Sequence, residues 1–187
     1  MKSMSGQEVA FSIVGAFIAT LLASFFSNNI LEAEGLPMIL ASTGASAMLI
    51  FGIPHSPVSQ PWPIVGGHII SAIIGVFSYQ LTPNPILASS FAIGLAMFAM
   101  HYTGCMHPPG GATAVTAVIG GATVHDLGYY FVIVPVFFNS IILLSVAMAV
   151  GTFRNDNPFA DSVLHDESEP SKDSSANNEL SNHSLKR

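Results

Sequence analysis

The sequence has very little charge, and the charge it has lies mostly near its two ends. Of its 187 residues, 9% are charged and 50% are hydrophobic. From Val9 to Phe153 there is no Lys or Arg, and the acids there are Glu32, Glu34 and Asp126. A water-soluble domain needs a charged, mixed surface, so this composition excludes one. The expected partner of this surface is a lipid bilayer, and nucleic acid is not expected.

Cysteine is nearly absent as well. The chain has one, Cys105, which excludes an internal disulfide framework and gives no indication of a redox role. We expect Cys105 to pack as a small apolar side chain, and we expect no cofactor.

What remains is a series of hydrophobic segments joined by short polar connections. Four have the length of a membrane-spanning helix: Val9–Ser27, Ile64–Leu81, Ile86–Thr103 and Tyr129–Phe153. Leu36–Gly52 is marginal, and Pro108–Gly121 is too short to cross about 30 Å of hydrocarbon as a helix. The sequence therefore predicts an all-α polytopic membrane protein with five to six hydrophobic segments.

The domain organisation follows from the same pattern. Residues 1–8 form a short leader segment, 9–153 the transmembrane domain, and 154–187 an acidic, Ser- and Asn-rich tail that is expected to be disordered. A signal peptide is the alternative for the first segment, but that segment is long and lacks a clear cleavage site. Lys2 and Arg154 flank the domain, so the positive-inside rule places both termini in the cytoplasm. The expected location is a bacterial inner (plasma) membrane.

Two short motifs suggest an internal repeat. GASAMLIFG (Gly44–Gly52) and GATAVTAVIG (Gly111–Gly120) both place Gly-Ala-hydroxyl-Ala at the start of an apolar stretch. Each stretch lies between two longer segments, which divides the chain into halves 9–81 and 86–153. Three segments per half give the halves opposite orientations. Inverted repeats with interrupted helices at matching positions are typical of transporters.

The sequence HPPGGATA interrupts a hydrophobic region where a membrane helix would be expected to continue. Proline cannot continue a helix but suits its first turn, so a half-helix is predicted to begin near Pro108. The amides of Gly110, Gly111 and Ala112 would then lack helical partners and could bind an anion. The candidate binding residues are His107, Pro108, Pro109, Gly110, Gly111 and Thr113, with Ser42, Thr43, Gly44 and Ser46 as the first-half equivalent.

Intramembrane histidines are natural candidates for proton coupling. His107 lies at the start of the predicted half-helix. The candidates for the path or for proton coupling are His68, His101, Ser56, Gln60 and His55. Two other interpretations stay open. Pro-Pro-Gly-Gly is also typical of a tight turn, and Gly67, Ser71 and Gly75 form a small-residue stripe that is typical of close helix contact.

Together these motifs resemble the HPP family of integral membrane proteins. The resemblance rests on HPPGGATA, on GASAMLIFG and on PHSPVSQPWPIVGGH (Pro54–His68), and it covers residues 9–153. Characterised members from cyanobacteria and chloroplasts are associated with nitrite transport, so the resemblance implies passage of an anion. Some members carry regulatory CBS domains after the membrane part, whereas an acidic tail follows it here. The positions that the resemblance marks are Gly44–Ala47, Pro54, Ser56, Pro57, Gln60, Pro61, Gly67, His68 and His107–Thr113.

The sequence thus favours a transporter or channel for a small monovalent anion, nitrite first and nitrate or a similar anion next. We expect no enzymatic activity, and a homo-oligomer is plausible at this size. The alternative is a pore for a small neutral solute, ammonia or a protonated weak acid. A metalloenzyme that uses His55, His68, His101 and His107 is disfavoured, because their spacing lacks the i, i+3 or i, i+4 pattern of helical metal sites.

Overall fold

The computed structural model describes residues 5–30 and 40–153. Within these ranges the chain forms the helices α1 (Gly6–Ile30), α2 (Ala41–Gly52), α3 (Pro61–Leu81), α4 (Pro85–Tyr102), α5 (Pro109–Ile119), α6 (Gly121–Leu127) and α7 (Phe138–Phe153). A 3-10 turn, Pro57–Ser59, precedes α3, and a π-helical stretch, Val132–Phe137, precedes α7. The predicted all-α class is therefore confirmed. The acidic tail and the first four residues of the leader segment lie outside the described residues.

The lengths of the helices follow the predicted division into long and short segments. Four stretches are long and apolar enough to cross a membrane, namely Gly6–Asn29, Pro61–Leu81, Pro85–Tyr102 and Val132–Phe153. The helices α2 and α5 have 12 and 11 residues, which is too short for a complete span. The start of the second predicted segment, 36–39, lies outside the described residues.

Helix starts are fixed by capping groups that the sequence supplies. Ser5 and Glu8 form a reciprocal capping box before α1, in which the Ser5 amide donates to the Glu8 carboxylate and the Glu8 amide donates to Ser5 Oγ. Asn84 Oδ1 accepts from the amides of Ile86 and Leu87 at the start of α4. Proline occupies the first turn of α3, α4 and α5, where its missing N–H costs nothing.

The sixth predicted segment is not one straight helix. Pro135 follows Val134, whose backbone is extended at φ −129° and ψ 112°, within the π-helical stretch. Proline removes a backbone donor and blocks a regular helical turn, which accounts for the break. The break places Val136, Asn139 and Ser140 beside the centre of the bundle, where they line a cavity.

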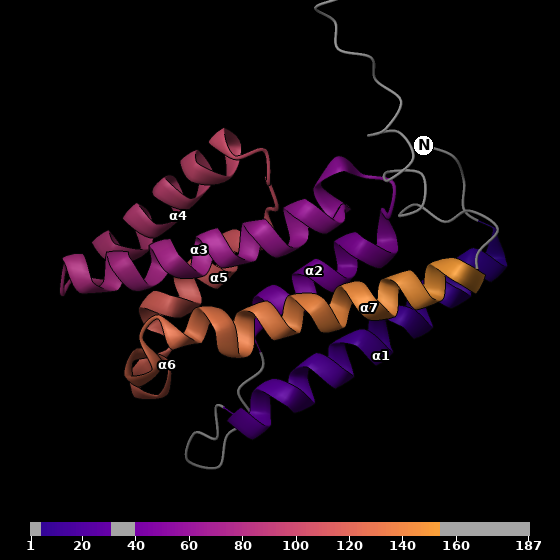
Figure 1. The fold of residues 1–187 in the computed structure, drawn as a ribbon, viewed down its shortest axis with the longest axis horizontal. Coiled ribbons are helices and arrows are strands. Elements are labelled where there is room, and N and C mark those ends of the chain that lie inside the picture. Colours follow the sequence, from indigo (N-terminus) through magenta and orange to yellow (C-terminus); the bar gives the residue numbers. More distant parts are fainter. Residues whose placement is uncertain (1–4, 31–39, 154–187) are drawn as a thin grey trace, which may run out of the picture.

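The long helices α1 and α3 run in one direction and α4 and α7 in the opposite one, and α1 begins at the same end of the bundle at which α7 ends (Figure 1). The helix contacts occur in matched pairs when the chain is divided into halves. α1 packs on α2 as α4 packs on α5, α1 on α7 as α4 on α3, and α2 on α7 as α5 on α3. This is the contact pattern that two equivalent halves would produce, and the inverted repeat itself stays a prediction.

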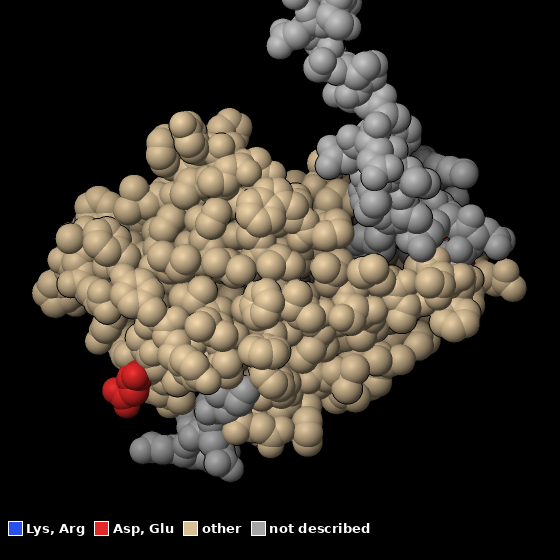
Figure 2. Space-filling view, in the orientation of Figure 1, with Lys and Arg blue, Asp and Glu red and all other residues tan. Residues whose placement is uncertain are grey.

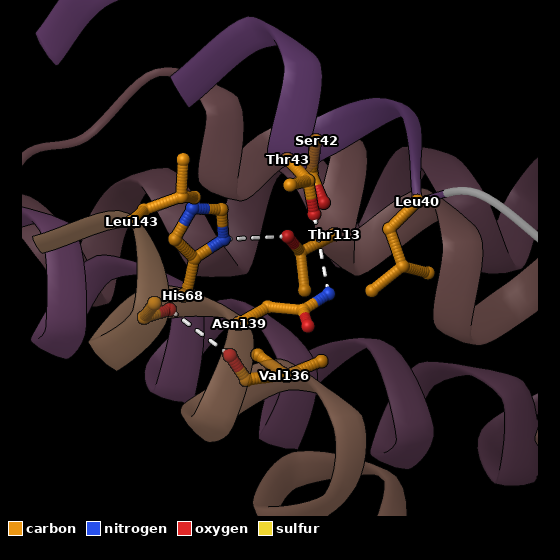
Figure 3. A pocket seen from close by; sticks show the side chains of 9 residues that line it. Leu40, Ser42, Thr43, His68, Thr113, Val136, Asn139 and Leu143 are labelled. Carbon is orange, nitrogen blue, oxygen red and sulfur yellow. Dashed lines mark hydrogen bonds between the residues drawn. The ribbon is translucent and has the colours of Figure 1, made fainter. Parts of the chain in front are cut away.

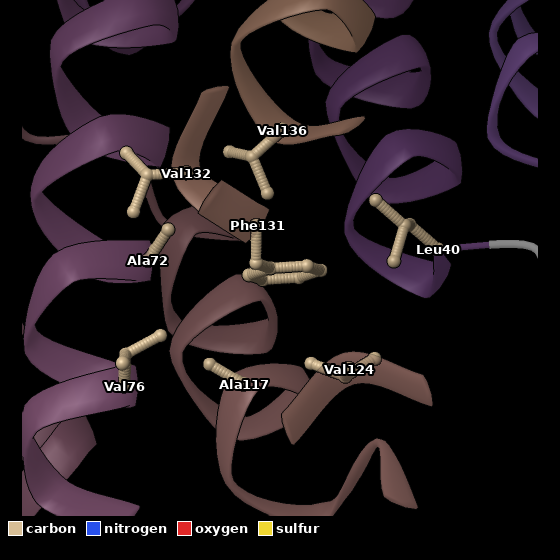
Figure 4. Packing of buried hydrophobic residues seen from close by; sticks show 8 residues of the cluster. All are labelled: Leu40, Ala72, Val76, Ala117, Val124, Phe131, Val132 and Val136. Atoms are coloured by element: carbon tan, nitrogen blue, oxygen red, sulfur yellow. The ribbon is translucent and has the colours of Figure 1, made fainter. Parts of the chain in front are cut away.

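Small residues allow α3 and α5 to approach closely. A Cβ atom built on Gly75 would lie 2.5 Å from the Ala114 carbonyl oxygen and 2.8 Å from Ala117 Cβ. Next to this contact, buried apolar side chains of α3, α5, α6 and the π-helical stretch surround the fully buried ring of Phe131 (Figure 4). Leu40 and Val136 belong to this cluster and also line the central cavity, so the cluster forms one of its walls.

The outer surface is apolar, as expected of helices that face lipid. Ile86, Phe98 and Met48 are each more than 70% exposed. In the view of Figure 2 the described surface is almost uniformly uncharged, with an acidic group near the end where α6 lies. The described ranges contain no Lys or Arg, and their acids are Glu8 and Asp126.

The contact between α3 and α5 predicts a clear difference between two glycine substitutions. Gly75→Ala is expected to destabilise the folded protein by about 1–3 kcal/mol, because its methyl group would push the Ala114 backbone away. Gly94→Ala on α4 is the control, since nothing lies within 4 Å of a Cβ atom there. The measurement is the thermal unfolding midpoint of the purified protein in detergent. Equal midpoints for the two variants would show that α3 and α5 do not need this close approach.

Candidate functional site

Two buried histidines from different parts of the chain share a single hydroxyl group. Ser46 Oγ on α2 lies 2.7 Å from His68 Nε2 on α3 and 2.8 Å from His107 Nε2 in the link between α4 and α5. The two imidazole rings are 5.0 Å apart between centroids. The exposed fraction is 0% for Ser46 and His107 and 4% for His68. These groups are therefore removed from both lipid and bulk water.

The other nitrogen of each imidazole also has a partner. His68 Nδ1 lies 2.7 Å from Thr113 Oγ1 on α5, and His107 Nδ1 lies 2.7 Å from the Val58 carbonyl oxygen in the loop between α2 and α3. Thr113, His68, Ser46, His107 and the Val58 carbonyl thus form one continuous series, which we call the histidine chain. Buried polar groups in a membrane must find such partners within the protein, because lipid offers none.

The two hydroxyls that hold His68 come from matching positions of the two sequence motifs. Ser46 is the third residue of GASA, and Thr113 is the third residue of GATA. Each lies in a short helix, α2 or α5, and each bonds a different nitrogen of the same imidazole. The sequence match indicated that these positions correspond, and the structure adds that they meet at one side chain.

Beside the histidine chain lies a small central cavity, which we call the polar pocket (Figure 3). Its volume is about 10 Å³, which is close to the minimum that a single water molecule needs. The polar pocket is lined by Leu40, Ser42, Thr43, His68, Thr113, Val136, Asn139, Ser140 and Leu143. Most of these side chains are polar, although the cavity is enclosed by helices of an otherwise apolar bundle.

Asn139 of α7 is the polar side chain whose hydrogen bonding is incomplete at this pocket. Its Nδ2 donates to Ser27 Oγ at 2.7 Å and to Thr43 Oγ1 at 3.3 Å, while its Oδ1 is buried without a partner. Because hydroxyls can donate or accept, rotating the amide by 180° would preserve both bonds and turn the amide N–H groups the other way. Asn139 can therefore offer the cavity either an acceptor or two donors.

The first turn of α2 also faces the polar pocket. Leu40 is the residue before the helix, and Ser42 and Thr43 lie in its first turn. The N-terminal end of a helix carries partial positive charge, which favours an anion nearby. Ser42 and Thr43 thus lie at a helix start, as the sequence predicts, and their role in binding stays a prediction. Gly44 follows them and is half-buried, with nothing within 4 Å of an added Cβ atom.

The prediction that the Gly110 and Gly111 amides at the start of α5 lack hydrogen-bond partners is wrong. The Gly110 amide donates to the His107 carbonyl oxygen at 2.9 Å, and the Gly111 amide donates to the Pro108 carbonyl oxygen at 3.0 Å. Both donors are used within the turn, because the chain already has helical geometry at Pro108, with φ −52° and ψ −39°. Gly110 serves close packing instead, since a Cβ atom there would lie 2.6 Å from Ser71 Oγ on α3.

The remaining predicted residues divide into structural and exposed positions. Gln60 Nε2 donates to the carbonyl oxygens of Pro54 and Ser56, so Gln60 and Ser56 stabilise the loop between α2 and α3. His55 and His101 are exposed, and neither lines the polar pocket. Pro108 is exposed and Pro109 is buried in the first turn of α5. Within residues 5–30 and 40–153, no group of three or more His, Cys, Asp and Glu side chains could hold a metal ion.

Sequence analysis missed three polar residues near the pocket. Asn139 and Ser140 line it, and Ser27 at the end of α1 bonds Asn139. A signal for Asn139 was present, because an amide inside the apolar run VFFNSIILL is costly in a membrane unless it has a role. Ser27 could not have been found this way, since its partner lies 112 residues further along the chain.

The histidine chain predicts different consequences for two threonines of α5. Thr113→Val is expected to destabilise the protein by about 1–3 kcal/mol, because His68 Nδ1 would be buried without a partner. Thr116→Val is the control, since Thr116 Oγ1 donates to the Ala112 carbonyl oxygen of its own helix, and its cost should stay within about 0.5 kcal/mol. Denaturation in detergent measures both. If Thr113→Val proved as stable as Thr116→Val, the hydrogen bond to His68 would contribute nothing to folding.

Comparison with known proteins places the chain in a family. Residues 1–159 match the family described as HPP, transmembrane region. A transmembrane protein of Dictyostelium discoideum is 36% identical over 157 residues, which cover 82% of this chain and 50% of the relative. A second transmembrane protein of that organism is 34% identical over 158 residues, covering 82% of this chain and 55% of the relative. The chain spans about half the length of these curated relatives.

No solved structure matches the chain. The family match covers the helices that carry the histidine chain and the polar pocket, and the relatives that match are transmembrane proteins. With its apolar spans and its short central helices, this chain belongs to the HPP transmembrane family and is an integral membrane protein.

Proposed function

We propose that this protein transports a small monovalent anion, nitrite in the first place, and that the anion binds in the polar pocket. The observation that carries the proposal is a buried cavity lined mainly by polar side chains, in a protein whose described residues include no Lys or Arg. Polar groups inside a membrane protein are costly to bury, so their clustering around a cavity indicates a binding or transport role. The resemblance to a family associated with nitrite transport agrees with this choice.

The lining favours an anion over a cation. The Ser42 hydroxyl can donate, and so can the Thr43 hydroxyl while it accepts from Asn139; if the Asn139 amide rotates, its two N–H donors take the place of the Thr43 donor. The start of α2 adds the positive end of a helix dipole. None of the nine lining residues is a carboxylate, the group that hard metal cations prefer. An anion would therefore be bound by neutral donors alone, weakly enough to be released.

The cavity volume of about 10 Å³ has a consequence for the transport cycle. A cavity at the limit for one water molecule cannot hold a nitrite ion without movement of the lining side chains. The structure therefore corresponds to a contracted state, and binding must widen the space between α2, α5 and α7. In an inverted-repeat transporter, such widening accompanies a movement of one half against the other.

The remaining features of the proposal concern topology and assembly. We place the two ends of the domain on the cytoplasmic side of a bacterial inner membrane, because Lys2 and Arg154 flank it. The protein acts as a transporter or channel and not as an enzyme. A homo-oligomer would brace the movement of so small a chain within the membrane.

Uptake of nitrite into vesicles that contain the purified protein tests the proposal. Asn139→Leu is expected to reduce uptake about tenfold or more, because the bound anion would lose a hydrogen-bonding partner in the polar pocket. Asn29→Leu is the matched control, since Asn29 is exposed at the end of α1 and donates to the Phe25 carbonyl oxygen of its own helix. Wild-type and Asn29→Leu vesicles should behave alike.

The same vesicles separate the proposal from its alternative. If wild-type vesicles take up no more nitrite than protein-free vesicles but do admit ammonia, the neutral-solute pore replaces the anion transporter. Uptake that survives Asn139→Leu unchanged would keep the function and move the binding site away from the polar pocket.

A further inference from the structure

The histidine chain ends on a group that can only accept a hydrogen bond. The Val58 carbonyl oxygen lies 2.7 Å from His107 Nδ1, so His107 must carry a proton on Nδ1. In a neutral imidazole the other nitrogen then has no proton and accepts. His107 Nε2 therefore accepts from the Ser46 hydroxyl, 2.8 Å away. One carbonyl oxygen thus fixes the direction of the first two bonds.

The same reasoning assigns the donor and the acceptor of each remaining hydrogen bond in the histidine chain. Ser46 has a single hydroxyl proton, which it donates to His107, so it must accept at its second contact. That contact is His68 Nε2 at 2.7 Å, which therefore carries the proton. His68 Nδ1 then has none and accepts from the Thr113 hydroxyl, 2.7 Å away. With both rings neutral, every donor in the series points the same way, from Thr113 towards Val58.

A uniformly directed chain can accept a proton at one end without losing any hydrogen bond. A proton that arrives at His68 Nδ1 releases the Nε2 proton to Ser46, and Ser46 passes its own proton to His107 Nε2. His107 becomes an imidazolium with protons on both nitrogens, and His68 stays neutral with its proton on Nδ1. The Thr113 hydroxyl rotates to accept from that Nδ1–H. One proton enters, and one positive charge appears on His107.

The two ends of the chain face different regions of the protein. His68 and Thr113 line the polar pocket. Val58 is half-buried in the loop that joins α2 to α3, and this loop lies towards the end of the bundle at which α1 begins (Figure 1). A proton on His107 can therefore leave from Nδ1 when the bond to Val58 opens. The histidine chain therefore connects the proposed anion site with the end of the bundle at which α1 begins.

The groups around the chain contribute no compensating charge. The other polar side chains that line the pocket with His68 and Thr113 are Ser42, Thr43, Asn139 and Ser140, and all four are neutral. Cys105 in the same link is bonded to Thr103 Oγ1. The acids of the described ranges are Glu8, which is half-buried in the first turn of α1, and Asp126, which is exposed in α6. An anion alone or an imidazolium alone would thus be an uncompensated buried charge.

We infer that the histidine chain is a proton relay that couples each anion in the polar pocket to one proton, so that transport is electrically neutral. This inference rests on the proposed anion transport. The proton comes from a protonated weak acid in the pocket, which leaves its anion there while the proton moves to His107. The anion in the pocket and the imidazolium of His107 stabilise each other, because the surrounding side chains supply no charge opposite to either. This mutual stabilisation is the physical basis of coupling. Ser46 is a positioning residue that carries the proton between the two imidazoles.

Vesicles with a trapped pH-sensitive dye test the relay, with nitrite as the probe. Net uptake, driven by an acidic exterior, should acidify the lumen in step with nitrite entry and should not respond to an imposed potassium potential. Ser46→Ala should reduce this net uptake about a hundredfold, the lower range of what a positioned proton-transfer group contributes. With equal nitrite concentrations on both sides, exchange of labelled nitrite should persist in Ser46→Ala. Each nitrite that enters is then matched by one that leaves, so no net proton transfer through the relay is needed. Protein-free vesicles measure the background uptake, which comes from nitrous acid that crosses the lipid directly.

Ser71→Ala is the matched control, since Ser71 is a buried serine of α3 outside the histidine chain, donating to Met100 Sδ. It should behave as wild type. If Ser46→Ala fails to fold, His107→Gln carries the same test, with the same loss of net uptake and the same retained exchange.

The outcomes that overturn the relay differ from those that overturn the transport. Wild-type uptake without acidification of the lumen, or uptake driven by voltage, overturns the relay and leaves anion transport in place. Full net uptake in folded Ser46→Ala and His107→Gln also overturns it, as does an equal loss of exchange in both variants. If wild-type vesicles show no uptake and no exchange above those of protein-free vesicles, the proposed function is overturned, and the relay with it.

Discussion

The bilayer offers no hydrogen-bond partner, and the buried imidazole of His68 meets this constraint by binding two hydroxyls on two different helices. Ser46 of α2 and Thr113 of α5 each bond one ring nitrogen. Three helices are thereby held at one point, and the small residues of α3 and α5 allow the close approach that this requires. The polar pocket exists because these bonds and the Pro135 break leave a space between α2, α5 and α7.

The short helices have a different use from the one that their sequence first suggests. A proline-started half-helix indicates free backbone amides, but Gly110 and Gly111 use theirs within the turn. Side chains supply the available hydrogen-bonding groups instead, and the interruption serves to bring His107 against Ser46. Gly67 makes room for this, since a Cβ atom there would lie 2.7 Å from His107 Cβ. The site is therefore built from hydroxyls, imidazoles and an amide.

The absence of fixed positive charge from the spans links the proposed function to the proposed coupling. Without a lysine or arginine in the spans, an anion in the pocket has weak binding and no permanent counter-charge. A proton on His107 would supply that charge temporarily and remove it when the proton leaves. The same composition that makes the bundle soluble in lipid would thus make proton and anion depend on each other.

The sequence by itself determined the membrane class, the four spanning helices and the two short ones, because apolar length and proline position act locally. It also singled out Ser46, His107 and Thr113 as candidates, since polar groups are conspicuous in apolar segments. Only the tertiary structure decided which of them meet. His68 bonds partners 22 and 45 residues away, and His107 bonds a serine 61 residues away. Such pairings depend on how whole helices pack, and no local pattern of residues specifies that.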